Sequence, residues 1–382
     1  MIWSWFGRIV AAAMAWAPVS AMAADATLAE KLAKVRAVAP LGVGHREATA
    51  AAKELAQVDA AQLPQILAAM DDAGPVATNW LRGIAESVSQ RGVANGGKLP
   101  LAELEKFLAE TSHSPRARRL AFEIIASVDA AAPGRLIPTL LHDPSTELRR
   151  EAVAVTLGEA AKQPETPAKI ATYRRAFQAS RDLDQIKAAA AKLKELKEPV
   201  DLPTHMGYVL TWKLIGPFDN VDDKGWDVDY PPEQSIDLAA TYDGQKGPVK
   251  WIDHTSADDY GVVDLNNALT KHMGAAAYAY AEFIAERDRP AELRIGSANA
   301  NKIWLNGQFL TANHVYHAGN SIDQYKAHGQ LKRGKNVILV KICQNEQKDA
   351  WAQDWKFQLR VCDTIGTAIL SQDRPSTKIA GG

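Results

Sequence analysis

Residues 291–309 read AELRIGSANANKIWLNGQF, and they decide the fold of the second half of the chain. Leu293 and Ile295 alternate with polar neighbours, as in a strand with one buried face. Turn-forming residues follow, and a second alternating stretch leads to Asn306-Gly307. This dipeptide is a strong hairpin signal, because both central residues of a type I′ turn need a positive φ. The stretch therefore predicts a strand, a turn, a second strand, a hairpin turn and a third strand.

Other short stretches of the second half have strand patterns separated by turn residues. With residues 291–309 they bring the expected number of strands to about eight. Short strands at this spacing are typical of an antiparallel sandwich or jelly roll rather than of alternating strands and helices. The other expected strands are 208–215, 249–252, 261–265, 275–285, 337–344 and 355–361.

The hairpin and a later turn also carry a family resemblance. WLNG at 304–307 and LKRGKN at 331–336 resemble the W-L-N-G-K … L-K-x-G-K-N pattern of galactose-binding-like β-sandwiches, such as the sugar-binding jelly roll of family 2 glycoside hydrolases. The resemblance covers most of residues 206–366. It implies a binding or structural module and names no ligand.

The first half has the spacing of short amphipathic helices punctuated by Pro and Gly. Residues 143–158, DPSTELRREAVAVTLG, resemble the second helix of a HEAT repeat, and residues 114–122 and 74–84 are weaker copies. Helix pairs of this kind stack into an α-solenoid, because each pair buries its apolar face only against its neighbours. An irregular helical bundle is the alternative.

We therefore expect an N-terminal HEAT-like α-solenoid followed by a C-terminal antiparallel β-sandwich or jelly roll. Two prolines, Pro199 and Pro203, mark the boundary between the helical half and the β half, because proline cannot continue a helix. The whole arrangement resembles exported bacterial proteins that join helical repeats to such a sandwich. The expected parts are a signal peptide at 1–23, a HEAT-like helical repeat domain at 24–198, a Pro-rich linker at 199–205, a galactose-binding-like β-sandwich at 206–366 and a flexible tail at 367–382.

The first residues have the pattern of a secretory signal. Arg8 is the only charged residue before Asp25, residues 9–18 are apolar, and AMA at 21–23 has the form of a signal-peptidase site. The segment is too short, and too soon interrupted by Pro18, to span a bilayer comfortably. We expect export to the periplasm or out of the cell, with no membrane span after cleavage.

Composition and motifs argue against two large function classes. The chain carries 44 Lys and Arg against 45 Asp and Glu, so it lacks the basic surplus of a nucleic-acid binder. It has no nucleophile elbow, zinc-protease, phosphate-loop or dinucleotide fingerprint. Asp258 and Asp259 are adjacent and do not define the separated carboxylate pair of a glycosidase. We expect a binding protein rather than an enzyme, with an unrecognised hydrolase as the weaker alternative.

The long loop at 221–236 is the main candidate for a ligand site, because long loops in compact domains are often functional. Loop aromatics can stack on the flat faces of sugars, while Asp and Asn bind the hydroxyl groups. In the alternative, these aromatics pin the loop to the rest of the protein. The candidate ligand-binding residues are Trp226, Asp229, Tyr230 and Trp351.

The same loop is acidic and could hold a structural Ca²⁺, since hard cations take several oxygen ligands and galactose-binding-like sandwiches often carry this ion. A solvated acidic loop without metal is the alternative, and no other cofactor is expected. The candidate metal ligands are Asp219, Asp222, Asp223 and Asp227.

Two further groups are expected to be structural. His314, Tyr316 and His317, near Asn313, favour a polar surface loop over a metal site that would also use His328. Four tryptophans have strand parity and are expected in the core: Trp212, Trp251, Trp304 and Trp355.

Cys343 and Cys362 are the only cysteines. If strands 337–344 and 355–362 form one antiparallel hairpin, the two residues lie about 20 Å apart at ~3.3 Å per residue. A disulfide needs Cα atoms within about 7 Å, so this pairing favours two free thiols. If the two strands pair differently, a disulfide between Cys343 and Cys362 remains an alternative.

Together these features predict an exported, non-catalytic protein that binds a glycan or another envelope protein through its β-sandwich. The helical repeats would then supply a protein-contact scaffold. A purely structural scaffold, with the sandwich packed on the solenoid, is the alternative.

Overall fold

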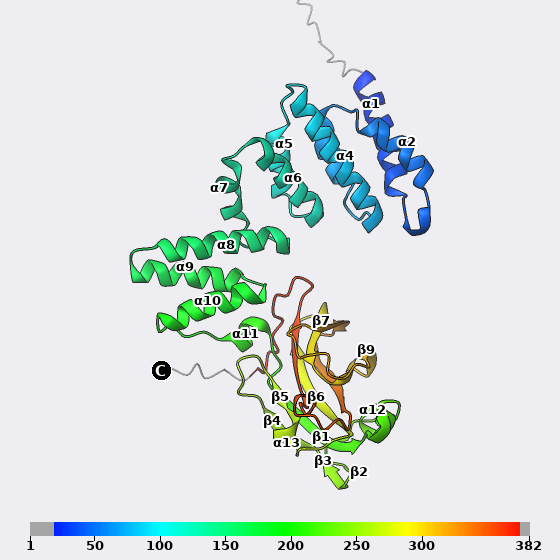
Figure 1. Ribbon diagram of the computed structural model, residues 1–382, viewed down its shortest axis with the longest axis vertical. Helices are drawn as coiled ribbons and strands as arrows, with labels where there is room; N and C mark the ends of the chain where they lie inside the picture. The colour runs from blue at the N-terminus through cyan, green and yellow to red at the C-terminus, as the bar shows by residue number, and fades with distance from the viewer. Residues whose placement is uncertain (1–18, 375–382) are drawn as a thin grey trace, which may run out of the picture. The chain divides into compact units, whose positions relative to one another are not determined.

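The computed structural model describes the backbone of residues 19–374 and the side chains of residues 27–374 (Figure 1). Most of the predicted signal peptide, residues 1–18, and the end of the predicted tail, residues 375–382, lie outside the described residues. The chain divides into two compact units, Met1–Ala152 and Val153–Gly382. None of the described helices combines the length and the hydrophobicity needed to cross a membrane.

The first unit is helical. Its apolar core is contributed by all of the longer helices, and it includes Leu55, Leu67, Leu81 and Ile125, none of which is exposed. The helices are α1 (Val19–Arg36), η1 (Pro40–Gly42), α2 (His45–Leu55), η2 (Ala60–Gln62), α3 (Leu63–Ala68), α4 (Pro75–Ala94), α5 (Leu101–Ala109), α6 (Pro115–Val128), α7 (Ala132–Leu136), η3 (Ile137–Leu140) and the start of α8 (Thr146–Lys162).

A buried ion pair joins three segments of this unit. Arg118 of α6 is 1% exposed and forms a two-pronged contact with Asp143, with Nη1 to Oδ1 at 2.8 Å and Nη2 to Oδ2 at 2.5 Å. Its Nε donates to the carbonyl oxygen of Leu108 at the end of α5. Asp143 Oδ1 also accepts from the amide of Ser145, just before α8. Because both charges are buried and paired, the ion pair holds the end of α5 and the start of α8 against α6.

The second unit begins with helices and continues with strands. After α8 its helices are α9 (Thr166–Ala179), α10 (Leu183–Glu195), α11 (Leu202–Met206), η4 (Val221–Trp226), α12 (Pro231–Gln234), α13 (Leu265–Ala268) and η5 (Ala350–Ala352). Its strands are β1 (Thr211–Asp219), β2 (Thr241–Gly244), β3 (Gly247–Lys250), β4 (Ile252–Thr255), β5 (Val263–Asp264), β6 (Ala275–Ala285), β7 (Arg289–Ser297), β8 (Ala300–Leu305), β9 (Gln308–Asn313), β10 (Tyr325–Leu331), β11 (Gly334–Gln344) and β12 (Lys356–Cys362).

The strands form an antiparallel sandwich. A six-stranded sheet has the order β4-β1-β6-β11-β8-β9, and a four-stranded sheet has the order β10-β7-β12-β5. A separate hairpin pairs β2 with β3. The predicted order of helices followed by an antiparallel β-sandwich is therefore confirmed, whereas the HEAT-like solenoid stays a prediction.

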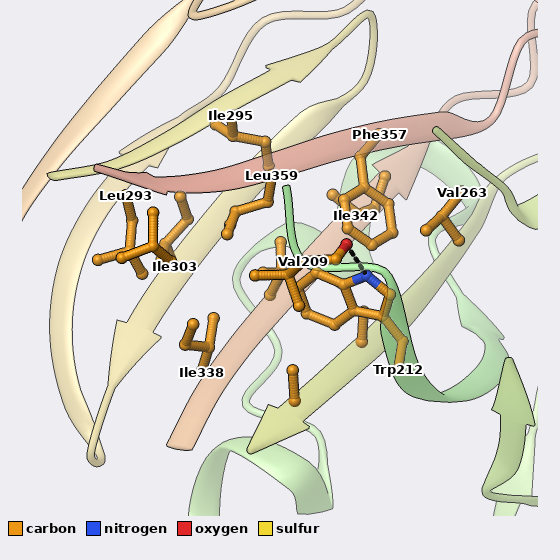
Figure 2. Packing of buried hydrophobic residues seen from close by; sticks show 14 of the residues in the cluster. Val209, Trp212, Val263, Leu293, Ile295, Ile303, Ile338, Ile342, Phe357 and Leu359 are labelled. Carbon is orange, nitrogen blue, oxygen red and sulfur yellow. Dashed lines mark hydrogen bonds between the residues drawn. The ribbon is translucent and has the colours of Figure 1, made fainter. Parts of the chain in front are cut away.

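Apolar residues from both sheets fill the space between them (Figure 2). Trp212 is 1% exposed and lies edge-on to Phe357, with ring centroids 5.2 Å apart. Its indole N–H donates to the carbonyl oxygen of Val209, and that of Trp355 donates to Ile342. Both indoles thus bury a large apolar ring with their one polar group satisfied. The prediction that Trp212 and Trp355 are core residues is confirmed.

The six-stranded sheet buries its second face as well. Along β6 the residues Ala277 and Ala279 face the sandwich core, and Tyr278 and Tyr280 face the opposite side. This alternation follows from the two-residue period of a strand. Trp251 and Trp304 are half-buried on the Tyr278 side and do not belong to the sandwich core. The loop between β1 and β4 packs on this outer face, and this packing positions the candidate site.

The opening stretch forms the expected hairpin. Asn306 and Gly307 have φ values of 52° and 75° and join β8 to β9, so the predicted type I′ turn is confirmed. The Asn306 side chain accepts a hydrogen bond from the amide of Val337 in β11. By contrast, β7 and β8 belong to different sheets, so the chain crosses the sandwich between them.

The two cysteines are buried, free thiols on different sheets. The hairpin assumed between residues 337–344 and 355–362 is wrong, because β11 pairs with β6 and β8 while β12 pairs with β7 and β5. Burial raises the pKa of Cys343 to about 12 and that of Cys362 to about 11, so both thiols stay protonated near neutral pH.

Segments predicted as a linker and a tail contribute to this unit. Leu202 and Met206 of α11 are buried with residues of α9 and α10 and with Tyr208. Ile369, which lies in the predicted tail, is 7% exposed in the sandwich core. The sandwich is therefore continuous with the helices that precede it and with the described residues that follow β12.

One histidine makes the second unit sensitive to acid. His205 of α11 packs against Phe177 with ring centroids 4.2 Å apart, and its Nε2 lies 3.2 Å from the carbonyl oxygen of Ser180. Burial, together with the nearby charge of Arg181, lowers the pKa of His205 to about 4. In the unfolded chain the pKa is near 6.5, so the unfolded state takes up a proton first as the pH falls.

We expect acidification from pH 7 to pH 5 to lower the free energy of unfolding of this unit by about 2 kcal/mol through His205. His205→Gln should remove this part of the pH dependence, because Gln does not titrate. The measurement is denaturant unfolding followed by tryptophan fluorescence at both pH values. His142→Gln is the control, because His142 is an exposed histidine outside this contact. An equal loss of stability in wild type and His205→Gln would contradict the assignment.

Candidate functional site

Two lysines of the outer sheet face hold the long loop in place. Lys341 of β11 and Lys302 of β8 are directly paired across the two strands. Both ammonium groups donate to the carbonyl oxygen of Trp226, at 3.3 Å from Lys341 and 2.7 Å from Lys302. The two side chains therefore fix the end of η4 above the middle of the sheet.

Lys341 is the more constrained of the two, because its side chain is 0% exposed. Its ammonium group lies 2.7 Å from Glu233 Oε1, which comes from α12, and also donates to the carbonyl oxygen of Val228 at 2.8 Å. Glu233 accepts a second hydrogen bond from the hydroxyl of Tyr278. Burial and the charge of Glu233 raise the pKa of Tyr278 far above its usual value. The buried ammonium group thus has three acceptors, and Glu233 Oε1 accepts from both Lys341 and Tyr278, so the buried charges are compensated as a buried ion pair requires.

Two aromatic residues of the loop pack inward. Tyr230 stacks on Phe218 with ring centroids 4.7 Å apart, and its hydroxyl donates to the carbonyl oxygen of Asp219 at 2.5 Å. Trp226 is 8% exposed and lies parallel to His314, with centroids 4.2 Å apart and planes 5° apart. Trp226 and Tyr230 therefore pin the loop to the rest of the protein, as the alternative to sugar binding predicts.

Trp226 begins a continuous row of aromatic side chains, which we call the aromatic row. His314 lies 5.9 Å from Tyr316, Tyr316 lies 6.3 Å from His317, and His317 lies 5.1 Å from Trp351. The two ends of the row differ in exposure, with 8% at Trp226 and 66% at Trp351, while His314 is exposed and Tyr316 and His317 are half-buried. The row therefore has a buried, fixed end and an end that is open to solvent.

Asp223 fixes the middle of the aromatic row. One of its carboxylate oxygens lies 2.6 Å from His314 Nε2, and the other accepts from the hydroxyl of Tyr316 at 2.5 Å. Burial and this hydrogen bond raise the pKa of Tyr316 well above its usual value. Asp222 and Asp223 have φ values of 54° and 62°, which non-glycine residues seldom adopt. The backbone of the loop is thus held in a costly conformation at the point where its carboxylate meets the row.

Buried and partly buried amides complete the support. Asn220 is 0% exposed, and its Nδ2 donates to the hydroxyl of Tyr316 at 3.1 Å and to the carbonyl oxygen of Gln344 at 3.0 Å. Asn345 Oδ1 lies 3.1 Å from His317 Nε2. Both tyrosine and histidine are therefore oriented by groups at the ends of β1 and β11.

The four predicted metal ligands do not form one site. Asp223 is engaged by His314 and Tyr316, Asp222 pairs with Lys224 at 2.9 Å, and Asp227 is exposed. Asp219 Oδ1 accepts from the amide of Val221. Within residues 27–374 no group of three or more His, Cys, Asp or Glu side chains is arranged to hold a metal ion.

The predicted ligand-binding residues divide into two kinds. Trp226 and Tyr230 support the loop, whereas Asp229 and Trp351 are exposed. His314, Tyr316 and His317 are predicted from the sequence to form a polar surface loop. In the structure their side chains connect Trp226 of the long loop to Trp351. His314 is 91 residues from Asp223 in the chain. No local pattern could have connected the two.

No protein-family model matches the chain, and no curated protein matches it. Similarities to solved structures are weak. A family 35 carbohydrate binding module from Clostridium thermocellum is 14% identical with a TM-score of 0.17, covering 23% of this chain and 71% of that one. A β-glucosidase from Kluyveromyces marxianus is 9% identical with a TM-score of 0.26, covering 80% of this chain and 38% of that one. An anti-sigma factor domain-containing protein is 12% identical with a TM-score of 0.22, covering 45% and 50%. The chain thus spans well under two thirds of the last two, and similarities this weak carry no argument about function.

The buried ion pair gives a direct test of how the loop is held. Lys341→Met leaves Glu233 buried without its partner, and we expect a loss of about 3–5 kcal/mol in the free energy of unfolding. Adding Glu233→Gln should recover most of this loss, because no unpaired charge is then buried. The measurement is denaturant unfolding of the wild type, both single variants and the double variant. Additive losses in the double variant would show that the two side chains do not act as a pair.

Proposed function

We propose that the protein binds glycans through the exposed end of the aromatic row. The observation that carries the proposal is that the row joins buried Trp226 to Trp351, which is 66% exposed. Aromatic faces held rigidly beside polar groups are suited to sugars, which combine apolar C–H faces with hydroxyl groups. The family resemblance of residues 304–307 and 331–336 to galactose-binding-like sandwiches supports the same function.

Polar partners for a sugar lie in the row and beside it. The side chains of Asp223 and His314 are 40% and 43% exposed, so each keeps part of its polar surface in solvent. Asp223 and His314 also hydrogen-bond to each other, which sets their orientation before a ligand arrives. Pre-ordering of this kind lowers the entropy cost of binding.

The wider proposal follows the sequence features. The signal pattern at residues 1–23 supports export to the periplasm or out of the cell, and the HEAT-like helices support a role as a protein-contact scaffold. Binding is proposed without a catalytic step. Recognition of another envelope protein by the same row is a second form of this proposal, since exposed tryptophans are also common at protein interfaces.

A purely structural role is the competing function, and one observation favours it. Trp226 and Tyr230 pack onto the sheet, so two of the three predicted ligand-binding aromatics stabilise the loop. In that case Trp351 would have no ligand, and its removal would change no binding.

We expect Trp351→Ala to weaken binding of the best glycan ligand about tenfold, or ~1.4 kcal/mol, without lowering the melting temperature. The ligand is first found by screening the full chain on a glycan array and is then titrated by calorimetry. Phe309→Ala is the matched control, because Phe309 is also an exposed aromatic at 52% but lies on β9 beside Trp304.

Two results would contradict the glycan proposal. One is the absence of any saturable glycan binding by the full chain. The other is equal affinity of wild type and Trp351→Ala for every glycan that binds. If the array is negative and Trp351→Ala abolishes capture of an envelope protein, the second form of the proposal stands instead.

A further inference from the structure

One edge of the six-stranded sheet is open. β9 is the outermost strand at this edge (Figure 1), and among the described residues no segment pairs with its free side. An edge strand presents unpaired backbone N–H and C=O groups, which can pair with a strand of another chain. Proteins usually hinder such pairing with charged residues, proline, bulges or very short edge strands.

The other edges of the two sandwich sheets carry such protection. β4, at the opposite edge of the same sheet, has four residues and includes Asp253, whose side chain is 82% exposed. In the four-stranded sheet, β10 carries the exposed residues Lys326 and His328, and β5 has only two residues. β9 has six residues, Gln308–Asn313, and contains neither a charged residue nor a proline. It is therefore the edge that is best able to accept another strand.

The open edge also bears an exposed apolar side chain. Phe309 is 52% exposed and packs edge-on against Trp304 of β8, with ring centroids 5.7 Å apart. Trp304 is itself only half-buried. Covering this apolar surface would stabilise a complex, because burial removes apolar area from water.

A bulge determines which side chains of β9 share a face. β8 pairs Trp304 with Phe309 and Lys302 with Ala312, so both β9 residues lie on the outer face of the sheet. In a regular strand, residues three positions apart face opposite ways. Leu310 is the extra residue of the bulge and packs against the core between the sheets. The outer face of β9 thus presents Phe309 and Ala312, and both are exposed.

This order of side chains is complementary to itself. If two β9 strands pair antiparallel about a twofold axis at the middle of the strand, Phe309 of each copy lies opposite Ala312 of the other, so a large residue meets a small one twice. Gln308 lies opposite Asn313, so no like charges face each other. The two bulges also lie opposite each other, so both strands have the same extra residue and the pairing stays in register.

We propose that the protein forms a symmetric homodimer in which the β9 strands of two copies pair and extend the six-stranded sheet across the interface. A second copy of the chain fits this edge because it supplies an uncharged strand with a small residue opposite Phe309. The twofold axis is perpendicular to the sheet, so the outer faces of both copies point to the same side. The interface does not include Trp351, and the proposal does not rest on glycan binding.

The first test is sedimentation equilibrium of the full chain from micromolar to millimolar concentration. We expect a monomer–dimer equilibrium for the wild type. Phe309→Glu and Ala312→Lys should each weaken dimerisation at least tenfold, because each places a charge against an uncharged strand. Thr255→Lys is the matched control, because it adds a charge at an exposed position of β4 at the opposite edge of the same sheet, and it should leave dimerisation unchanged. A wild type that stays monomeric over the whole range would overturn the proposal.

Mixing the two variants tests the pairing itself. In a mixed dimer Phe309→Glu of one copy faces Ala312→Lys of the other, and the second contact keeps the native side chains. We expect the mixture to dimerise more tightly than either variant alone, and added salt should weaken this recovery, because salt screens the new ion pair. A mixture that dimerises no more tightly than the separate variants would refute the pairing, as would a wild-type dimer that neither variant weakens.

Discussion

The charge of Lys341 is buried completely, and much of the second unit is arranged around that constraint. A buried ammonium group needs an opposite charge and further acceptors, which here are Glu233 and the carbonyl oxygens of Val228 and Trp226. All three belong to the loop between β1 and β4. The sheet therefore holds this loop through the hydrogen bonds and the ion pair of Lys341. Trp226, held in this way, in turn stacks on His314 of the aromatic row.

The six-stranded sheet has two buried faces with different chemistry. One face is apolar and meets the four-stranded sheet, where alanines of β6 leave room for Trp212 and Trp355. The other face carries Tyr278, Lys302 and Lys341, which bind the loop by hydrogen bonds. The first face stabilises the fold through burial of apolar area. The second face positions the loop through hydrogen bonds.

Local pattern predicted the elements of the sandwich better than their partners. The alternation of Leu293 and Ile295 and the need of Asn306 and Gly307 for positive φ are properties of a few adjacent residues, and both are confirmed. The pairing of the segment at 355–362 depends on residues far away in the chain. The hairpin with 337–344 that the sequence leaves open is not formed, because a strand's alternation does not say which strand lies beside it.

The amino-acid sequence by itself determined that helices precede an antiparallel sandwich, where the hairpin turns, and that the loop at 221–236 is acidic and aromatic. Only the tertiary structure decided that Trp226 and Tyr230 point inward and that Asp223 meets His314 and Tyr316. The physical reason is range. Periodicity and turn chemistry are set by neighbours in the chain, whereas burial and hydrogen bonding also depend on residues far apart in the chain, such as Arg181 and Thr367, which are 186 positions apart.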